Sequence, residues 1–285
     1  MGSFSVLHNI SGINAQNQLN LNNVNLSRTL ARLSSGKRIN SGADDAAGLQ
    51  IADSLRGNVK AIDQAVRNAN DGISVSQIAD GALNEISNLL TRAITLAEEA
   101  ATETVDATGR TSLNNEWSAI QSEVARIASQ TNFNGVALFT AGGVNGSLSV
   151  FVGDLSNTTS SISVSITTIT TSGNTVTSLN GSDLSGVNLE SQATAASALA
   201  TLKTALTNVA SARANIGAGI NRLQSAVAVM QTQAQNTAAA ESMIRDANMA
   251  EEVANLTKYQ ILSQSGIAAL SQANTNAQSV LSLFL

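Results

Sequence analysis

The chain of 285 residues contains no cysteine and no proline, and only 2% of its residues are aromatic. The missing cysteines exclude disulfides, zinc ribbons, iron-sulfur ligation and thiol nucleophiles. The missing prolines remove the commonest helix breaker, and the scarcity of aromatic side chains removes much of the bulk of an ordinary globular core. These absences predict thin layers of long helices that pack through Ala, Leu, Ile and Val.

Positive charge is scarce as well. The chain has 15 Lys and Arg against 20 Asp and Glu, a formal net charge of -5, so it lacks the basic footprint that nucleic-acid binding requires. No apolar run approaches the roughly 20 residues of a membrane span, and the start of the chain lacks the pattern of a cleavable signal peptide. We therefore expect no nucleic-acid partner and no membrane insertion. The chain is predicted to be cytoplasmic or to be exported by a route without such a signal.

Helical periodicity dominates both sides of the chain. Between residues 44 and 101, and again between 199 and 244, apolar residues recur in alternating steps of three and four, which is typical of a coiled-coil seam. A shorter segment with the same pattern covers 113–127. The pair Thr108 and Gly109 is the predicted turn before this segment.

The two ends of the chain carry narrower apolar stripes, separated by Asn, Gln and Ser. The residues of these stripes are Leu19, Leu26, Leu30, Leu33, Val253, Leu256, Ile267, Leu270, Leu281 and Phe284. Such stripes bury too little area on an isolated helix to offset the entropy of ordering it. We therefore predict that both ends are disordered in the monomer and fold only with a partner.

Between residues 132 and 190 the helical period disappears, and Ser, Thr, Gly and Val predominate. Apolar and polar residues alternate there, as they do in half-buried strands, and Asn-Gly turn signals begin at Asn134, Asn145 and Asn180. The predicted fold class is mainly α. It is a long antiparallel coiled-coil helical rod with a small inserted β-hairpin region.

Side chains with catalytic chemistry are scarce. The single histidine, His8, has no nucleophile or base near it in the sequence. Gly36 and Lys37 lack the earlier glycine and the following Ser or Thr of a phosphate loop. Asp44 and Asp45 precede a helical pattern, so we interpret them as helix caps rather than as an acid-base or metal pair. Because no cluster has the spacing of metal ligands, we expect no catalytic residue, no cofactor and no metal.

Two features of the last long seam have more than one interpretation. Arg213 either sets the helix register as a polar seam residue or extends its charge outward, and we favour the outward orientation. The glycines of segment 216–220 lack a complete dinucleotide fingerprint. We expect them to allow close packing of helices.

Several segments, taken in order, resemble those of a known family. They are LSSGKRINSGADDAAGLQIADSLRG at 33–57, RNANDGIS at 67–74, NFNGVALF at 132–139, ESMIRDANMAEEVANLTKYQIL at 241–262 and the terminal SVLSLFL. With these blocks the chain resembles bacterial flagellins, the subunits of the flagellar filament. The resemblance implies a secreted, extracellular structural protein rather than an enzyme, which polymerises into the helical filament used for swimming motility.

The resemblance also implies a domain organisation. Residues 1–44 and 246–285 would form an inner terminal coiled-coil domain, and 45–155 and 191–245 a helical rod domain with β-hairpins. Only 156–190 remains for a short variable insert. Subunits would be exported unfolded and would assemble at the tip, where the apolar stripes of both ends form the assembly interface.

The partners that the resemblance implies are other copies of the chain, a flagellar export chaperone, the filament cap and hook-junction proteins. Arg92, Leu96 and Glu116 match positions through which animal innate immune receptors recognise flagellins, and contact with a neighbouring subunit is the alternative role for them. For the whole chain, the alternatives are a hook-filament junction protein of the same flagellar family, a helical secreted enzyme, and a coiled-coil adhesin or translocator.

Overall fold

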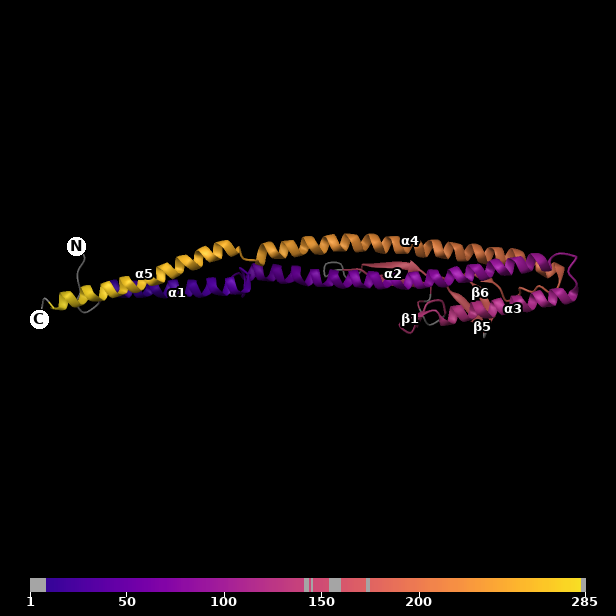
Figure 1. The fold of residues 1–285 in the computed structure, drawn as a ribbon, viewed down its shortest axis with the longest axis horizontal. Helices are drawn as coiled ribbons and strands as arrows, with labels where there is room; N and C mark the ends of the chain where they lie inside the picture. The colour runs from indigo at the N-terminus through magenta and orange to yellow at the C-terminus, as the bar shows by residue number, and fades with distance from the viewer. Residues whose placement is uncertain (1–8, 141–143, 145, 154–159, 173–174, 283–285) are drawn as a thin grey trace. The chain divides into compact units, whose positions relative to one another are not determined.

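The computed structural model describes residues 9–140, 144, 146–153, 160–172 and 175–282. Most of these residues are helical (Figure 1). The helices are α1 (Ile10–Ser35), α2 (Ala46–Ala100), α3 (Ala107–Gln130), α4 (Gln192–Arg245) and α5 (Met249–Ser282). The prediction of a mainly α chain with long helices and a few small hairpins is confirmed.

Contacts between residues divide the chain into two compact units. We call residues 1–57 and 236–285 the terminal unit, and residues 58–235 the central unit. Helices α2 and α4 each contribute residues to both units. The segment 156–190 belongs to the central unit, and the three-part domain assignment made from the sequence stays a prediction.

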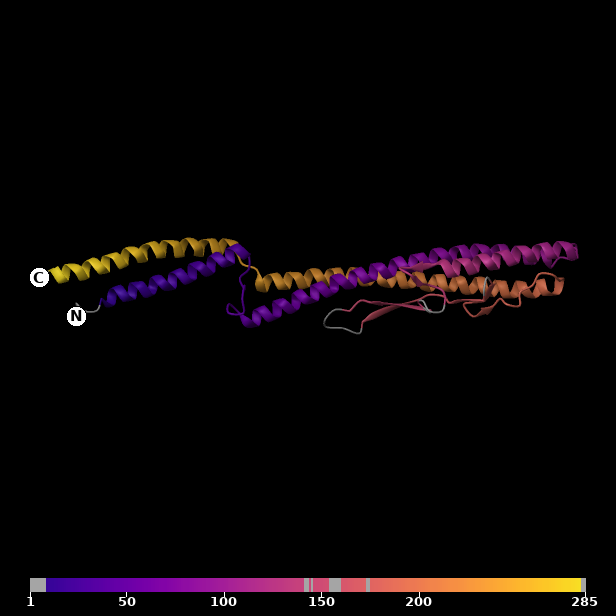
Figure 2. The same cartoon turned by 90° about the horizontal axis from the view of Figure 1, so that it is seen from below.

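In the terminal unit, α1 and α5 lie side by side and run in opposite directions (Figures 1 and 2). At the start of α1, the Asn9 amide nitrogen donates to the backbone oxygen of Ala273 at 3.2 Å. The Asn9 side-chain oxygen also accepts from the Gly12 N–H at 2.9 Å and so caps α1. At the other end of the helix pair, the Arg32 guanidinium lies 3.3 Å from the Glu252 carboxylate. These contacts align the two helices in one register.

Residues 10–35 and 249–282 are helical in this single chain, whereas the sequence predicted that both ends are disordered in a monomer without a partner. The reason is that each end helix packs on the other. A narrow stripe that is too small to order one isolated helix has a ready partner when the two ends meet. The coupling of this order to assembly stays a prediction.

In the central unit, α2, α3 and α4 lie alongside one another (Figure 1). Helix α3 begins after Asp106, whose side-chain oxygen accepts from the Gly109 N–H at 2.7 Å. The turn predicted at Thr108 and Gly109 is therefore wrong, because both residues lie in the first turn of α3. The Asp106 cap starts the helix two residues before Thr108, and the connection from α2 covers 101–106.

The core of the central unit is one cluster of buried apolar side chains from helices and hairpins. Small aliphatic residues supply most of it, and Trp117 and Phe139 are its fully buried aromatic members. Besides Trp117, its largest buried side chains are Ile62, Leu83, Ile86, Leu90, Leu96, Leu138, Phe139, Ile166, Ile169, Leu179 and Leu184. The thin layers that the composition predicted therefore pack mainly through small aliphatic side chains.

The strands form small antiparallel sheets. They are β1 (Asn132–Phe133), β2 (Val136–Ala137), β3 (Ser147–Phe151), β4 (Ser161–Ser165), β5 (Ile169–Ser172), β6 (Thr175–Leu179) and β7 (Ser182–Asp183). β1 pairs with β2, β3 with β4, and β6 lies between β5 and β7. Two predicted Asn-Gly turns are present, because Asn134 and Asn180 have φ angles of 49° and 47°. Asn145 lies outside the described residues.

The β3–β4 hairpin sits on two glycines of the long helices. A Cβ added to Gly72 of α2 would lie 2.5 Å from the nearest methyl of Val150, and one added to Gly219 of α4 would lie 2.7 Å from a methyl of Val164. Both distances are too short for a real side chain. Gly219 therefore admits a strand, which corrects the prediction that the glycines of 216–220 serve close packing between helices.

Arg213 of α4 points to α2. Its Nε lies 2.9 Å from the Asp80 carboxylate, and its Nη1 donates to the Asn84 side-chain oxygen at 2.9 Å. The hydrogen bond with Asp80 raises the pKa of Arg213. The outward orientation that we favoured is therefore wrong, since the residue makes a polar contact between helices. The sequence could not identify the partner, which lies far away along the chain.

Candidate assembly surface

The buried positions described in the seam between α1 and α5 hold polar residues or glycine. Within the described part of the terminal unit, Ile39 and Ala52 are the only fully buried apolar residues, and neither lies on α1 or α5. The buried residues of the helix pair are Gly12, Asn22, Thr29 and Glu252. A buried polar group contributes little net stability even when it is hydrogen-bonded. This seam therefore aligns the two helices but holds them weakly.

Ten large apolar side chains of α1 and α5 are exposed to solvent. Their exposed fractions range from 39% for Leu262 to 59% for Leu21. We call them the outer apolar set, and its members are Ile10, Ile13, Leu21, Val24, Leu30, Met249, Val253, Ile261, Leu262 and Ile267. Soluble monomers rarely expose so many large apolar side chains on two adjacent helices, so the set indicates an interaction surface.

The residues predicted for the assembly interface fall into two groups. Leu30, Val253 and Ile267 belong to the outer apolar set. The half-buried group is Leu19, Leu26, Leu33, Leu256 and Leu270. Leu19 of this group packs on α5, since its Cδ1 lies 3.3 Å from the place that a Cβ of Gly266 would take. Leu19 therefore lies at the seam within one chain.

Two predicted residues have no described side chain. They are Leu281, which lies in the last turn of α5, and Phe284, which lies outside the described residues.

The sequence prediction missed part of the outer apolar set. The missed residues are Ile10, Ile13, Leu21, Val24, Met249, Ile261 and Leu262. Selection by heptad steps found the stripe from Leu19 to Leu33 and passed over apolar residues beside it. A count of the apolar residues that lie off that stripe would have found a second apolar face on the same helix.

The segments that connect the end helices to α2 and α4 are paired with each other. Gly36, with a φ of 70°, ends α1, and the next residue, Lys37, forms an antiparallel bridge with Asp246. The Ala247 N–H donates to the Gly36 oxygen at 2.9 Å, and the Arg38 N–H donates to the backbone oxygen of residue 245 at 2.7 Å. Gly36 is therefore a helix-ending residue and not part of a phosphate loop.

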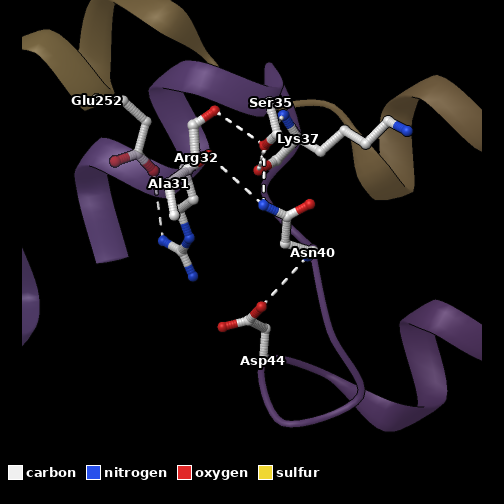
Figure 3. A network of polar contacts seen from close by, with 7 residues as sticks. All are labelled: Ala31, Arg32, Ser35, Lys37, Asn40, Asp44 and Glu252. Atoms are coloured by element: carbon white, nitrogen blue, oxygen red, sulfur yellow. Dashed lines mark hydrogen bonds and ion pairs between the residues drawn. The ribbon is translucent and has the colours of Figure 1, made fainter. Parts of the chain in front are cut away.

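A polar network supports the first of these connections (Figure 3). The Asn40 side chain donates to the Ser35 hydroxyl at 3.1 Å. The Asp44 carboxylate accepts from the backbone N–H groups of Asn40 and Ser41, at 3.2 and 3.1 Å. These bonds, led by the one from the Ser41 N–H, lower the pKa of Asp44. The ionised carboxylate of Asp44 therefore stabilises the connecting loop.

Asp45 caps helix α2, because its Oδ1 accepts from the Gly48 N–H at 2.9 Å. The interpretation of the Asp44 and Asp45 pair as capping residues is thus confirmed for Asp45, while Asp44 closes the turn before the cap. Among the residues that the structure describes, no group of His, Asp and Glu side chains could hold a metal ion. His8 lies outside those residues.

The positions matched to immune-receptor contacts lie in the central unit. Arg92 and Glu116 are half exposed and form an ion pair 2.7 Å long between α2 and α3. That hydrogen bond and the charge of Glu116 raise the pKa of Arg92. Leu96 is only 1% exposed, so its expected role as a surface contact is not compatible with the folded unit. The helical period places Leu96 on the core side of α2.

Helices of this length raise the question of membrane insertion. Among the residues that the structure describes, no helix is both long enough and apolar enough to span a bilayer.

Comparison with known proteins assigns the chain to a family. Residues 6–143 match the bacterial flagellin N-terminal helical region, and residues 199–284 match the bacterial flagellin C-terminal helical region. Flagellin FlaB1 of Treponema pallidum (strain Nichols) is 36% identical over 284 residues, which cover 97% of this chain and 98% of that protein. The flagellin of Bacillus subtilis (strain 168) is 37% identical over 300 residues, with the same coverage of both chains.

Among solved structures, a protein described as flagellar hook-associated from Vibrio parahaemolyticus aligns with a TM-score of 0.56. The alignment covers 71% of this chain and 99% of that one at 15% identity, so this likeness shows the fold alone. The curated relatives are filament proteins, and none of these matches favours the hook-filament junction alternative. The chain therefore belongs to the bacterial flagellin family, whose members are structural subunits of the flagellar filament.

Proposed function

We propose that the outer apolar set of the terminal unit is the surface through which copies of this chain bind one another in the filament. The observation that carries the proposal is the exposure of these side chains on both end helices. The role is structural and not enzymatic. It retains Leu30, Val253 and Ile267 from the sequence prediction and adds the exposed apolar residues that the heptad steps passed over.

The energetics favour this surface over the seam. Burying apolar area contributes about 25 cal/mol per Å², and the seam within one chain already buries polar residues such as Asn22 and Thr29. The unused apolar area is that of the outer apolar set. A contact between two different patches on identical chains forms a ring only when the rotation from one chain to the next closes on itself. When that rotation does not close, the contact produces an open helical polymer.

The test replaces two outer residues, Leu21→Ser and Ile261→Ser, in the full chain. Their exposed fractions are 59% and 57%, so the substitutions should leave the fold of one chain intact. We expect the critical concentration for polymerisation to rise at least about tenfold, since each lost apolar contact costs on the order of 1.5 kcal/mol. Sedimentation and electron microscopy measure the polymer.

The matched control is Asn20→Ser with Gln260→Ser, which changes exposed polar neighbours on the same two helices. It should polymerise as the parent does. Polymerisation of the Leu21→Ser and Ile261→Ser variant at the parent's critical concentration would contradict the proposal.

We further infer that the chain is secreted, is exported unfolded and assembles at the filament tip. The absence of cysteine supports this inference, since no disulfide has to form before or after passage. An export chaperone, the filament cap and hook-junction proteins are the proposed partners besides other copies of the chain. The chaperone is tested by measuring how the monomer and the polymer of this chain bind to an immobilised flagellin chaperone. Equal binding by both forms would contradict the proposed chaperone role.

Recognition by an animal innate immune receptor is proposed only through Arg92 and Glu116, because Leu96 is buried. Contact of the same residues with a neighbouring subunit is the alternative. Titration of the parent and of Arg92→Ala against the receptor ectodomain separates the two. Equal affinities would remove the receptor role.

A further inference from the structure

Two hairpin turns of the central unit are nearly identical in backbone. Asn134-Gly135 joins β1 to β2 between the paired residues Phe133 and Val136, and Asn180-Gly181 joins β6 to β7 between Leu179 and Ser182. Each asparagine and each glycine has a positive φ, with values of 49° and 79° in the first turn and 47° and 86° in the second. The two turns can therefore be compared as a matched pair.

An Asn-Gly pair has its own chemistry. The backbone nitrogen of the glycine attacks the side-chain carbonyl carbon of the asparagine, a C–N bond forms, and the amide leaves as ammonia with the proton that the glycine nitrogen loses. Water then opens the resulting five-membered imide to aspartate or isoaspartate. The net reaction consumes one water and releases one ammonia, so no other reactant is needed. Glycine lets this happen because it has no side chain to shield the nitrogen.

The surroundings of the two asparagines differ. The Asn180 side-chain nitrogen donates to the backbone oxygen of Asn208 on α4 at 3.2 Å, and the Asn208 side chain donates back to the Asn180 backbone oxygen at 3.3 Å. Asn208 also donates to the Ser182 hydroxyl at 2.9 Å, and the Asn180 N–H donates to the Thr168 oxygen at 3.1 Å. Helix α4 and the neighbouring chain therefore hold the second turn on both sides of its reacting bond.

Asn134 has no such support. Asn134 and Gly135 are exposed, as Asn180 and Gly181 are, but the Asn134 side chain makes no hydrogen bond to any residue in the described part of the chain. The side chain is free to rotate toward the glycine nitrogen. We propose that Asn134 is the preferred site of spontaneous deamidation in the two described Asn-Gly turns, and that α4 protects Asn180.

The product at residue 134 has a structural consequence. Asn134 lines a groove together with Asp71, Val136 and Phe151. Aspartate there adds a second negative charge near Asp71. Isoaspartate lengthens the main chain by one carbon atom, which a two-residue turn of this type does not accommodate.

The experiment uses the full chain in mildly alkaline buffer made with oxygen-18 water. Peptide mass spectrometry then follows the label that enters each new carboxylate. We expect residue 134 to be labelled at least about fivefold faster than residue 180, the factor that corresponds to one net hydrogen bond. In urea, where α4 no longer holds either turn, the two rates should converge.

A pair of variants tests the protection directly. Asn208→Ala removes the side-chain bonds to the Asn180 oxygen and the Ser182 hydroxyl but keeps the backbone acceptor of the Asn180 side chain. Labelling at residue 180 should therefore accelerate and stay below the rate at 134. Asn215→Ala, an exposed position on the same helix, should leave both rates unchanged. Hydrogen exchange of α4 confirms that each variant is folded. Labelling of residue 180 at or above the rate of 134 in the folded parent, or a difference that persists in urea, would overturn the proposal.

Discussion

The central and terminal units are built from the same kind of long helix, yet they distribute apolar side chains in opposite ways. The central unit buries a continuous apolar cluster that includes Leu83 and Leu90. The terminal unit aligns α1 and α5 through buried polar residues such as Asn22 and Thr29, and it leaves Leu21 and its neighbours exposed. The first unit is thus stabilised within one chain, while the apolar area of the second is available to other chains.

The two units also differ in where polar side chains connect their helices. In the central unit, Arg213 contacts Asp80 and Asn84 at the edge of an apolar core. In the terminal unit, the Arg32 guanidinium pairs with the buried Glu252 in the seam itself. A partly exposed ion pair on an apolar core specifies register at little cost. A polar seam without an apolar core makes the helix pair easier to open.

The largest expected effect comes from a core truncation. Leu83 is fully buried, so Leu83→Ala should lower the free energy of unfolding by about 2 to 5 kcal/mol, measured by urea denaturation of the monomer. Leu30→Ala in the terminal unit removes the same atoms from a side chain that is 47% exposed. It should change the stability by less than about 0.5 kcal/mol. Comparable losses in both variants would erase the difference between the units.

The next largest effect on stability is expected at Gly219, one of the two helix glycines on which the β3–β4 hairpin packs. Gly219→Ala should destabilise the central unit by about 1 to 3 kcal/mol through overpacking against Val164. Combined with Val164→Ala, it should cost less than the sum of the two single changes. Gly217→Ala is the control on the same helix, where nothing lies within 4 Å of the added methyl. A loss of stability in this control as large as that of Gly219→Ala would contradict the steric argument.

A third prediction concerns the polar seam. Glu252→Ala should speed hydrogen exchange of α1 and α5 amides by an amount equivalent to about 1 to 3 kcal/mol, because it leaves the Arg32 guanidinium without its partner. Replacing both residues together, Arg32→Met with Glu252→Leu, should restore much of the protection. If the double variant exchanges as fast as the single one, the ion pair is not the group that closes this end of the seam.

The smallest effect is a pH dependence in the connecting loop. The folded-state pKa of Asp44 is lowered by hydrogen bonds from the Ser41 and Asn40 N–H groups. Its contribution to stability is therefore present above the unfolded pKa and is lost as the pH falls through the folded one. Because the group lies near the surface, we expect less than about 1 kcal/mol. Hydrogen exchange of residues 40–45 in an acid titration measures this contribution.

In Asp44→Asn the loop should exchange faster at neutral pH and should lose most of its acid dependence. Asp71→Asn, an exposed carboxylate of the central unit, serves as the control and should leave the loop unchanged. An acid dependence of the loop that survives in Asp44→Asn would assign it to another group.

Much of the fold was predictable from the sequence because the signals are local. The period of three and four residues located the long helices, and the Asn-Gly pairs located the turns at Asn134 and Asn180. The predictions were wrong where the structure of a residue depended on its contact with another residue. The cap at Asp106 moved the start of α3, and Asp80 on another helix gave Arg213 a partner that the seam pattern did not contain.

The candidate surface was predicted only in part for the same reason. A heptad count identifies a stripe but not what covers it, so it combined Leu19, which packs on α5, with Leu30, which faces solvent. The resemblance to flagellins placed Leu96 among surface contacts, although the fold buries that side chain.

The sequence alone determined that this chain has no disulfide crosslinks, that long helices flank a short hairpin region, and that several segments, taken in order, resemble those of flagellins. These properties follow from composition and from interactions between residues close together in the chain. Only the tertiary structure decided which apolar side chains of α1 and α5 point outward, and which Asn-Gly turn a helix protects. Those outcomes depend on contacts between residues distant in the sequence, which no local pattern encodes.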